Sequence, residues 1–431
     1  MGKDLQTVDS YIPRLIDREL ARKLQTFGAV EIAGTMGCGK TWTSTAQGKS
    51  MTRLEDKPIR MVAEADPQTA LMGDLPHVID EWQTIPALWD TVRIAVDQSG
   101  TLPGQFILTA SSQPRKELIL HSGAGRISSI RMRTMSLLEK GLSSGKVSLG
   151  GLFRGEFTPQ LVQQKLWPLA QYICQGGWPA LANHPEADVA LYLDSYFDAL
   201  FDVILPNLGL RSLEARNAAL SLAKHQGSPV TLSTIAANAQ FGEGPSKGAS
   251  EKASKYISAL QEMYIVEAIK GWDAPVRSKS RVRTKPKYYF ADPSMGARLL
   301  DVTPDKLVQD GQLFSVLFEA MCMHDLLVYT ALLPEAGPDA VHYYRDSDGL
   351  ETDAVIELRD GRWAAMEIEL GENKMKESIR SLSRLRNKIA ANPAARNPEP
   401  SFLAVLVGAG EYARYDPTTG VYIIPLTALG V

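Results

Sequence analysis

The chain has 431 residues, which at about 150 residues per domain corresponds to about two to four domains. With 44% hydrophobic and 22% charged residues, the composition is that of an ordinary globular protein, and a wholly disordered, collagen-like or coiled-coil chain is excluded. The formal net charge is only −3, so any binding of nucleic acid must depend on local basic patches.

The cysteines and the apolar runs indicate the compartment. Cys38, Cys174 and Cys322 are widely spaced and form neither a disulfide framework nor a paired zinc-ligand motif, which favours a reducing compartment. No apolar run approaches the about 18 residues of a membrane span, and the initial MGKDLQTVDS lacks the basic-then-apolar plan of a signal peptide. We therefore expect a cytoplasmic protein that does not contact a membrane.

The first third of the chain alternates apolar runs with helix-length stretches. The runs are AVEIA (29–33), IRMVA (59–63), HVI (77–79), QFIL (105–108) and ISSIRM (127–132). Short buried strands separated by helices predict an α/β fold with a parallel sheet. From about residue 165 to 270 the pattern is helical, and residues 284–431 mix strands with helices.

A phosphate-binding loop lies between the first predicted strand and the helix after it. GTMGCGKT matches G-x-x-x-x-G-K-[ST], in which backbone N–H groups surround phosphates, the lysine reaches the β- and γ-phosphates and the last hydroxyl holds Mg²⁺. The predicted nucleotide-binding residues are Gly34, Thr35, Met36, Gly37, Cys38, Gly39, Lys40 and Thr41. The alternative is a glycine-rich turn without ligand. We interpret Cys38 as a small tolerated residue rather than a redox switch.

Two adjacent acids end the next apolar strand, in LPHVIDEWQ (75–83). Asp80 would orient the Mg²⁺ shell together with Thr41, and Glu81 would polarise the attacking water. The alternative is a surface acid pair at a strand end. The run at 59–63 lies between the two motifs, which fits the NTPases that insert a strand between the two motif strands and use a catalytic glutamate.

Two further residues could contact the γ-phosphate. The strand QFILT ends in Ala110, Ser111 and Ser112, and Ser111 could sense that phosphate. Arg126, in GAGRISS, could stabilise transition-state charge within its own chain or across a subunit boundary, which leaves a homo-oligomer open. The alternative is that Arg126 is merely solvated or ion-paired.

These motifs together resemble one branch of the AAA+ ATPases, the archaeal-ATPase-like proteins. The segments YIPRLID (11–17), GTMGCGKT, VIDEWQ, FILTASS, GAGR and MSLLE (135–139) follow one another in that family's order. GGWP (176–179), KPKYYFAD (285–292) and GLETDAVIE (349–357) resemble the family's second, uncharacterised domain. The resemblance implies an N-terminal P-loop ATPase that binds ATP and Mg²⁺. Ala110 stands where the family has a glycine before the sensing serine.

The middle of the chain predicts a winged helix-turn-helix. The sequence predicts a helix that begins near residues 228–231, then a glycine-rich turn, a second helix over about 252–264 and the strand IVEAIK. The stretch 270–287 then carries seven basic residues against Asp273, a balance of 7 − 1 = +6. The basic residues are Lys270, Arg277, Lys279, Arg281, Arg283, Lys285 and Lys287. A basic hairpin beside a helix-turn-helix suits contacts with duplex DNA. The alternative is a protein-binding module with a solvated tip.

The last third resembles restriction-endonuclease-like folds. Glu319 on a helix, Asp353 on a strand and Glu367 on the next strand match the acids that bind a divalent ion in those folds. Glu369, however, stands where the lysine of E-x-K belongs, and Lys374 or Lys376 could supply the missing cation. A retained fold without cleavage is the alternative. A second basic stretch, 374–396, has apolar residues at helical spacing and predicts a helix with a basic outer face.

We therefore divide the chain into an AAA+ ATPase domain (1–160), a helical and winged-helix region (161–285) and a restriction-endonuclease-like α/β domain (286–431). The expected function is ATP hydrolysis coupled to a C-terminal module that binds DNA or a partner. Two alternatives stay open: a nucleotide-controlled switch that binds a protein and not DNA, and an ATP-regulated, metal-dependent DNA nuclease.

Overall fold

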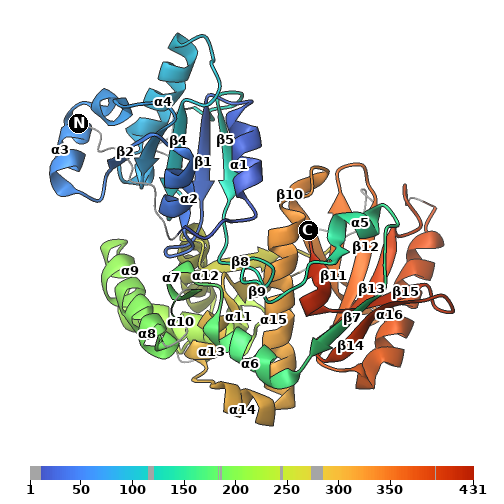
Figure 1. Ribbon diagram of the computed structural model, residues 1–431. Helices are drawn as coiled ribbons and strands as arrows, with labels where there is room; N and C mark the ends of the chain where they lie inside the picture. Colours follow the sequence, from blue (N-terminus) through green and yellow to red (C-terminus); the bar gives the residue numbers. More distant parts are fainter. Residues whose placement is uncertain are drawn as a thin grey trace. The chain divides into compact units, whose positions relative to one another are not determined.

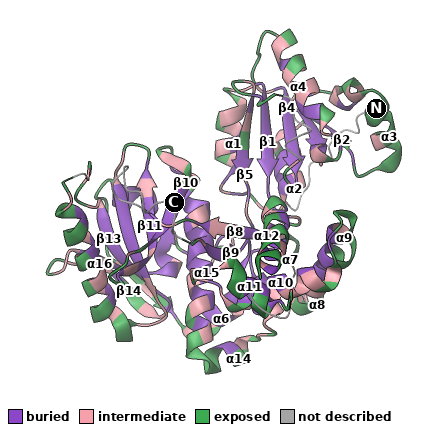
Figure 2. Ribbon diagram, turned by 180° about the vertical axis from the view of Figure 1, so that it is seen from behind, coloured by how far each residue is buried: buried purple, intermediate pink, exposed green. Residues whose placement is uncertain are grey.

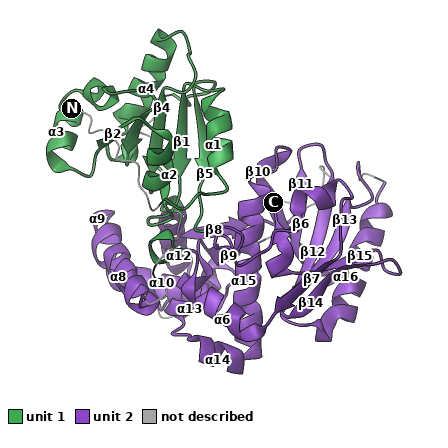
Figure 3. Ribbon diagram, in the orientation of Figure 1, with its two compact units in different colours: residues 1–135, 178–184, 262–264 green, residues 136–177, 185–261, 265–431 purple. Residues whose placement is uncertain are grey.

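The computed structural model describes residues 11–114, 121–182, 184, 187–242, 246–272, 285–393 and 395–431. The chain forms two compact units, which Figure 3 shows in different colours. Unit 1 is built from the described residues of 1–135, 178–184 and 262–264, and unit 2 from those of 136–177, 185–261 and 265–431. The division into three domains, at residues 160 and 285, stays a prediction.

Unit 1 is a parallel α/β sheet, as the sequence predicts (Figure 1). Its strands are β1 (Ala29–Ala33), β2 (Ser50–Arg53), β3 (His77–Asp80), β4 (Phe106–Ala110) and β5 (Ile127–Arg131). They lie in the order β2-β3-β4-β1-β5, and every neighbouring pair is parallel. β1, β3 and β4 are buried along their whole length, which is typical of a parallel sheet covered on both faces (Figure 2).

Helices and turns connect these strands. They are α1 (Asp17–Leu24), α2 (Lys40–Gln47), α3 (Lys57–Ala65), η1 (Pro67–Leu71), η2 (Trp82–Thr84) and α4 (Ala87–Gln98), together with α7 (Pro179–Ala182). Trp82 and Trp89 pack with their ring centroids 5.0 Å apart in the core of the unit. Because Trp82 directly follows Glu81, this core anchors the segment that carries the two predicted acids.

The strand predicted at residues 59–63 is wrong, because these residues belong to α3. Pro58 lies in the first turn of that helix, where its fixed φ is favourable and its missing N–H is not needed. Of the helix only Ala63 is buried, so the apolar run does not belong to the sheet. The strand inserted between the two motif strands is instead β4, which lies between β1 and β3.

The first part of unit 2 is mainly helical. Its helices are α5 (Leu149–Phe153), α6 (Leu166–Gln175), α8 (Val189–Asp198), the π-helical η4 (Ala199–Ile204), α9 (Leu205–Asn207), α10 (Ser212–Lys224), α11 (Leu232–Asn238), α12 (Lys247–Glu262), α13 (Pro293–Leu299) and α14 (Pro304–Gln309). Thr231 caps α11 by accepting a hydrogen bond from the Thr234 N–H. After α12, β8 (Val266–Ile269) and β9 (Lys287–Phe290) pair antiparallel. The predicted order of helix, turn, helix and strand is confirmed, although α12 begins at Lys247 rather than Lys252.

The second part of unit 2 is a mixed sheet between two helices. Its strands are β7 (Gln160–Gln164), β10 (Ala336–Arg345), β11 (Glu351–Leu358), β12 (Trp363–Glu369), β13 (Phe402–Val407), β14 (Gly410–Asp416) and β15 (Val421–Pro425). They lie in the order β10-β11-β12-β13-β15-β14-β7. Figures 1 and 2 show α15 (Gly311–Thr330) and α16 (Met375–Ala390) on opposite faces of this sheet. Two short strands, β6 (Val147–Ser148) and β16 (Leu429–Gly430), pair separately, and the turns η6 (Glu372–Lys374) and η7 (Leu426–Ala428) complete the unit.

Helix α15 is long and apolar enough to cross a membrane by length and composition alone. However, 72% of its apolar window is buried inside the protein. Phe314, Leu317 and Phe318 are among its buried side chains. Such burial is that of a core helix, and α15 carries the predicted Glu319 against the sheet.

Candidate functional site

The loop between β1 and α2 is folded around its lysine. Gly37 and Gly39 have φ angles of 74° and 103°, left-handed values that favour glycine. A Cβ atom at Gly34 would collide with the backbone oxygen of Met132, so this position requires glycine as well. Lys40 is buried, and its Nζ donates to two carbonyl oxygens of the loop at 2.9 and 3.0 Å. The ammonium therefore lies where phosphates bound by such a loop would meet it.

An arginine of the YIPRLID segment donates a hydrogen bond to the backbone of this loop. The guanidinium of Arg14, which is buried, donates to the backbone oxygen of Cys38 at 2.7 Å and to that of Arg133 at 2.9 Å. The Tyr11 hydroxyl lies 3.1 Å from the Thr43 hydroxyl of α2. Cys38 itself is fully buried, which agrees with its interpretation as a small packed residue.

Asp80, at the end of β3, lies beside the last residue of the loop. Its Oδ1 accepts hydrogen bonds from the Thr41 hydroxyl at 3.0 Å and from the Thr109 hydroxyl of β4 at 2.6 Å. Burial raises the pKa of this carboxyl, and the two threonine hydrogen bonds oppose the rise. A hydroxyl and a carboxylate at hydrogen-bond distance form an oxygen donor set that fits Mg²⁺.

Glu81 is held by its neighbours in a left-handed backbone conformation, with φ 59° and ψ 44°. Its N–H donates to the Thr109 hydroxyl at 3.0 Å. Its side chain accepts hydrogen bonds from the Ser111 hydroxyl and, at 2.5 Å, from Gln83 Nε2. Thr109 thus connects Asp80 with Glu81. The predicted residues all lie at or after the carboxyl ends of β1, β3 and β4: Lys40, Thr41, Asp80, Glu81 and Ser111.

Arg126 lies at the other edge of the sheet. It directly precedes β5, whose first residue pairs with Ala29 at the start of β1, whereas the loop follows Ala33 at the end of β1. At about 3.3 Å per residue, the length of β1 separates Arg126 from the loop by about 15 Å. Arg126 instead forms an ion pair with Asp97 of α4 at 2.7 Å. The structure therefore contradicts a role within its own chain, and a role across a subunit boundary stays a prediction.

Two of the predicted nuclease-like acids, Glu319 and Asp353, lie beside a buried lysine of β9. Lys287 is only 1% exposed, and its Nζ lies 3.3 Å from Glu319, 3.0 Å from Glu351 and 3.8 Å from Asp353. The Tyr289 hydroxyl also donates to Glu319, at 2.6 Å. Burial alone would lower the pKa of Lys287, but the three carboxylates raise it above its usual value. The charged ammonium occupies the centre of the acidic cluster.

Glu367 and Glu369 lie on the same face of β12, as two residues in i, i+2 positions must. Burial and the charge of Asp353 raise the pKa of Glu367 to about 9, and a hydrogen bond joins the two side chains. Burial likewise raises the pKa of Glu369, which accepts a hydrogen bond from Ser378 of α16 at 2.6 Å. Lys374 lowers that pKa by its charge but forms no part of the cluster around Asp353.

The metal site predicted at Glu319, Asp353 and Glu367 is not formed. Among the residues that the structure describes, no group of three His, Cys, Asp or Glu side chains is placed to hold a metal ion. The physical reason is that Lys287 neutralises Glu319 and Asp353, while Glu367 pairs with Asp353 as a protonated carboxyl. The cation beside Glu319 and Asp353 is Lys287 of β9, and not Lys374 or Lys376.

Three family models match successive parts of the chain. A model described as AAA domain matches residues 26–140, which include the loop, both acids and Ser111. Models described as Domain of unknown function (DUF8612) and Domain of unknown function (DUF4143) match residues 167–306 and 315–429. The chain therefore carries an AAA domain, as the resemblance predicts. Its AAA domain is N-terminal and is followed by the two domains of unknown function.

Relatives of this AAA protein are known by sequence and by structure. Uncharacterized proteins of Mycobacterium tuberculosis and Mycobacterium bovis are each 25% identical over 358 residues, 81% of this chain and 72% of the relative. The Walker-type ATPase of Pyrococcus abyssi covers 67% of this chain and 96% of its own, with 12% identity and a TM-score of 0.41. The RuvB Holliday junction branch migration motor of Thermotoga maritima covers 58% and 88%, with 16% identity and a TM-score of 0.26. At such scores the likeness does not extend to function.

The two basic stretches of the AAA protein differ in what the structure describes of them. Arg277, Lys279, Arg281 and Arg283 lie outside the described residues. Lys287, counted with them from the sequence, is buried in the acidic cluster. In the second stretch, α16 packs Leu382, Leu385 and Ile389 into the core of unit 2, which confirms the predicted helix, and Lys388 pairs with Asp346 at 2.6 Å.

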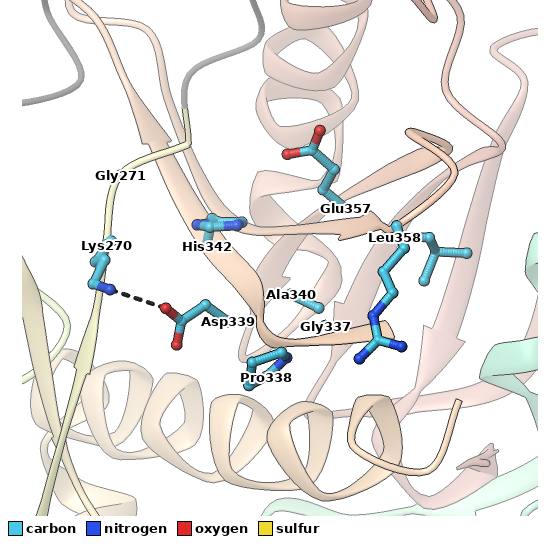
Figure 4. Close-up of a pocket in the computed structure, with 10 residues that line it drawn as sticks. Lys270, Gly271, Gly337, Pro338, Asp339, Ala340, His342, Glu357 and Leu358 are labelled. Carbon is cyan, nitrogen blue, oxygen red and sulfur yellow. Dashed lines mark hydrogen bonds and ion pairs between the residues drawn. The ribbon is translucent and has the colours of Figure 1, made fainter. Parts of the chain in front are cut away.

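A cavity of about 640 Å³ lies between β10, β11 and the chain after β8 (Figure 4). Figure 4 shows Lys270 and Asp339 at its rim, joined by an ion pair of 3.0 Å, and His342 and Glu357 on its wall. Glu357 accepts a hydrogen bond from the Trp272 indole at 2.9 Å. The cavity contains none of the residues predicted for either site, and we assign it no role.

Sequence reasoning missed four residues around these sites: Arg14, Gln83, Thr109 and Lys287. Arg14 and Gln83 stand inside segments that were singled out, YIPRLID and VIDEWQ, but their contacts were not anticipated. Thr109 directly precedes the strand-ending Ala110, a position from which a side chain can reach the neighbouring strand end. For Lys287 the signal was its place at the start of the apolar run KYYFA, where an inward-facing lysine needs acidic partners.

Proposed function

We propose that this AAA protein is an ATP hydrolase that binds ATP with Mg²⁺ at the loop of residues 34–41. The observation that carries the proposal is the network that joins Thr41, Asp80, Thr109 and Glu81 at the carboxyl edge of the sheet. It connects the loop that would hold the phosphates to the carboxylate that would take a proton. The match of the AAA domain over the same residues supports it.

Each residue of the proposed site would have its own role in hydrolysis. Lys40 would exchange the two loop carbonyls for the β- and γ-phosphates. Thr41 and Asp80 would hold Mg²⁺, which, when bound, neutralises charge on the phosphates. Ser111 would contact the γ-phosphate. Glu81 would accept a proton from a water whose oxygen bonds to the γ-phosphorus, as the bond to the bridging oxygen breaks and ADP and inorganic phosphate form.

We further propose that hydrolysis is coupled to duplex DNA through the C-terminal half. The order α11, α12, β8, β9 fits the plan of a winged helix-turn-helix, and the sequence between β8 and β9 carries six basic residues, among them Arg277, Lys279, Arg281 and Arg283. The order α15, β10, β11, β12, α16, β13 supports assigning the last part to the restriction-endonuclease-like folds. Nuclease activity is not proposed, because Lys287 neutralises the acids that a metal would need.

A second candidate function is a nucleotide-controlled switch that binds a protein partner and not DNA. Four apolar side chains on neighbouring elements of unit 2 favour it, since they are 47% to 70% exposed. They are Leu191, Val203, Leu208 and Leu213. Either function suits the cytoplasm, where ATP is available, and an Arg126 that acts on the nucleotide of a second copy would require a homo-oligomer.

The test is ATP turnover with Mg²⁺ by wild type, Glu81→Gln and Glu64→Gln, each with and without duplex DNA. Gln keeps the shape of Glu81 and removes its basic oxygen, so turnover should fall about 10²-fold or more while ATP affinity is kept. Glu64 is exposed on α3 and serves as the matched control, which should behave as wild type. Absence of turnover by wild type, or wild-type turnover by Glu81→Gln, would contradict the assignment. Turnover that duplex DNA does not change would favour the protein-binding switch.

A further inference from the structure

Gln83 lies in the turn η2 and connects two residues of the proposed ATPase site. Its Nε2 donates to Glu81 Oε2 at 2.5 Å and to Ser111 Oγ at 3.1 Å. The Ser111 hydroxyl donates to the same oxygen of Glu81. The three side chains therefore form a closed triangle, in which two donors occupy one carboxylate oxygen.

The chemistry of this triangle fixes the orientation of the Gln83 amide. A carboxylate can only accept hydrogen bonds, so the amide nitrogen must face Glu81 and the amide oxygen must face elsewhere. That oxygen, Gln83 Oε1, is buried and has no hydrogen-bond partner among the residues that the structure describes. Buried carbonyl oxygens almost always accept a hydrogen bond, so this atom requires a donor beyond those that the described residues supply.

Glu81 is fixed in a way that leaves one oxygen for chemistry. Its backbone N–H donates to Thr109, and its backbone oxygen accepts from the Thr84 hydroxyl at 2.8 Å. Its Oε2 is occupied by Ser111 and Gln83. Within the described part of the chain no hydrogen bond engages Oε1, which is the oxygen left to take a proton.

We propose that Gln83 is a further catalytic residue of the proposed ATP hydrolysis: its amide nitrogen orients Glu81 and Ser111, and its amide oxygen accepts a hydrogen bond from the attacking water. One hydrogen of that water points to Gln83 Oε1, and the other passes as a proton to Glu81 Oε1 while the water oxygen bonds to the γ-phosphorus. The bond between that phosphorus and the bridging oxygen breaks and releases ADP. The inference rests on the proposed hydrolase function.

The experiment compares wild type, Gln83→Ala, Gln83→Glu and the control Gln98→Ala. Gln98 is an exposed glutamine at the end of α4 in the same unit. Turnover of ATP is measured from pH 5.5 to 9, and binding of a non-hydrolysable ATP analogue is measured by calorimetric titration. The titration separates loss of the site from loss of the chemical step.

In Gln83→Ala, kcat should fall about 10²-fold, as expected when an aligned proton-transfer arrangement is lost, with KM and analogue affinity within twofold of wild type. Gln83→Glu places a second carboxylate against Glu81, and two such groups in contact share a proton. The pH below which turnover falls should therefore move upward in Gln83→Glu, and less so in Gln83→Ala, which only loses donors. Gln98→Ala should match wild type in every measurement.

Two outcomes would overturn the inference alone. One is Gln83→Ala turnover within twofold of an active wild type. The other is lower turnover with an equally lowered analogue affinity and an unmoved pH profile, which would make Gln83 merely structural. Wild type that binds the analogue and turns over no ATP would overturn the proposed function, and the role of Gln83 with it.

Discussion

Single residues of the proposed nucleotide site could be placed from the sequence because their chemistry depends on local spacing. The loop and Glu81 each follow a short strand, Asp80 ends one, and parallel strands bring their carboxyl ends to one edge. Thr109, Gln83 and Arg14 could not be predicted, because their roles depend on which strands are neighbours and on the rotamers they adopt. Thr109 reaches Asp80 only because β4 lies beside β3. The sequence instead predicts that residues 59–63 form the strand between the two motif strands.

In the acidic cluster of unit 2, counting charges along the sequence likewise fails to show where a charged side chain lies. The sequence places Lys287 in a basic hairpin that suits contacts with DNA, yet this lysine is 1% exposed and lies among carboxylates. The side chains of β9 are buried throughout, so its lysine has to be paired inside the protein. The cluster leaves Glu367 and Glu319 with pKa values raised to about 9 and about 7 by burial and by the charge of Asp353.

The raised pKa of Glu367 predicts that stability falls as pH rises. The folded chain keeps a proton on Glu367 that the unfolded chain releases near the ordinary value of 4.5. Since the folded state binds this proton between about pH 5 and pH 9, Glu367 lowers the unfolding free energy by up to about 1.4 kcal/mol per pH unit there. Denaturant unfolding followed by tryptophan fluorescence should give lower midpoints at pH 8.5 than at pH 5.5.

The variant Glu367→Gln tests this source of the pH dependence. Gln is neutral at every pH, so the variant should be more stable than wild type at pH 8.5 and should depend less steeply on pH. Glu399→Gln removes an exposed glutamate and should leave the wild-type dependence unchanged. Equal slopes for Glu367→Gln and wild type would mean that Glu367 does not hold its proton in the folded protein.

At the scale of elements, apolar runs predicted strands well where the runs are buried and badly where they are not. Residues 59–63 are as apolar as a strand, but Pro58 lies in the first turn of a helix and the side chains around Ala63 stay exposed.

Two of the segments that resemble the family lie in contact with each other in the structure. Asp292 accepts hydrogen bonds from the N–H groups of Gly177 and Ser294, and a Cβ at Gly176, with φ of 68°, would collide with it. This contact joins GGWP to the end of KPKYYFAD.

The segment between β8 and β9 provides the prediction at this scale. If its arginines and lysine contact phosphates, log affinity for duplex DNA should fall with log salt by about 0.9 for each phosphate neutralised. Replacing Arg277, Lys279, Arg281 and Arg283 with Ser should flatten that slope by roughly three to four units. The affinity is measured by fluorescence anisotropy of a labelled duplex between low and physiological salt.

The matched control removes the same number of charges from the other basic stretch. Its four residues are Lys374, Lys376, Arg380 and Arg384, all exposed. This variant should keep the wild-type slope. Binding that is absent or insensitive to salt would transfer support to the protein-binding switch, and a flattened slope in the control alone would place the DNA contact on α16.

For the whole molecule, the sequence indicates the order of the domains along the chain. It does not indicate which parts of the chain pack together into one compact unit. The AAA domain, DUF8612 and DUF4143 follow one another along the chain, whereas unit 2 gathers the helical part and the mixed sheet together. Part of the reason is β7, which lies early in the chain and pairs with β14 near its end. Pairing across so long a stretch of chain leaves no periodic signal in a single sequence.

Nucleotide binding by wild type and Lys40→Ala, titrated with Mg²⁺ and a non-hydrolysable ATP analogue, tests most directly that residues 34–41 bind ATP. The ammonium is the charge inside the loop, so Lys40→Ala should lose affinity at least about 100-fold while its circular dichroism and melting temperature stay those of wild type. Lys49→Ala, which removes an exposed lysine of the same unit, should bind as wild type does. Wild-type affinity in folded Lys40→Ala would contradict the account.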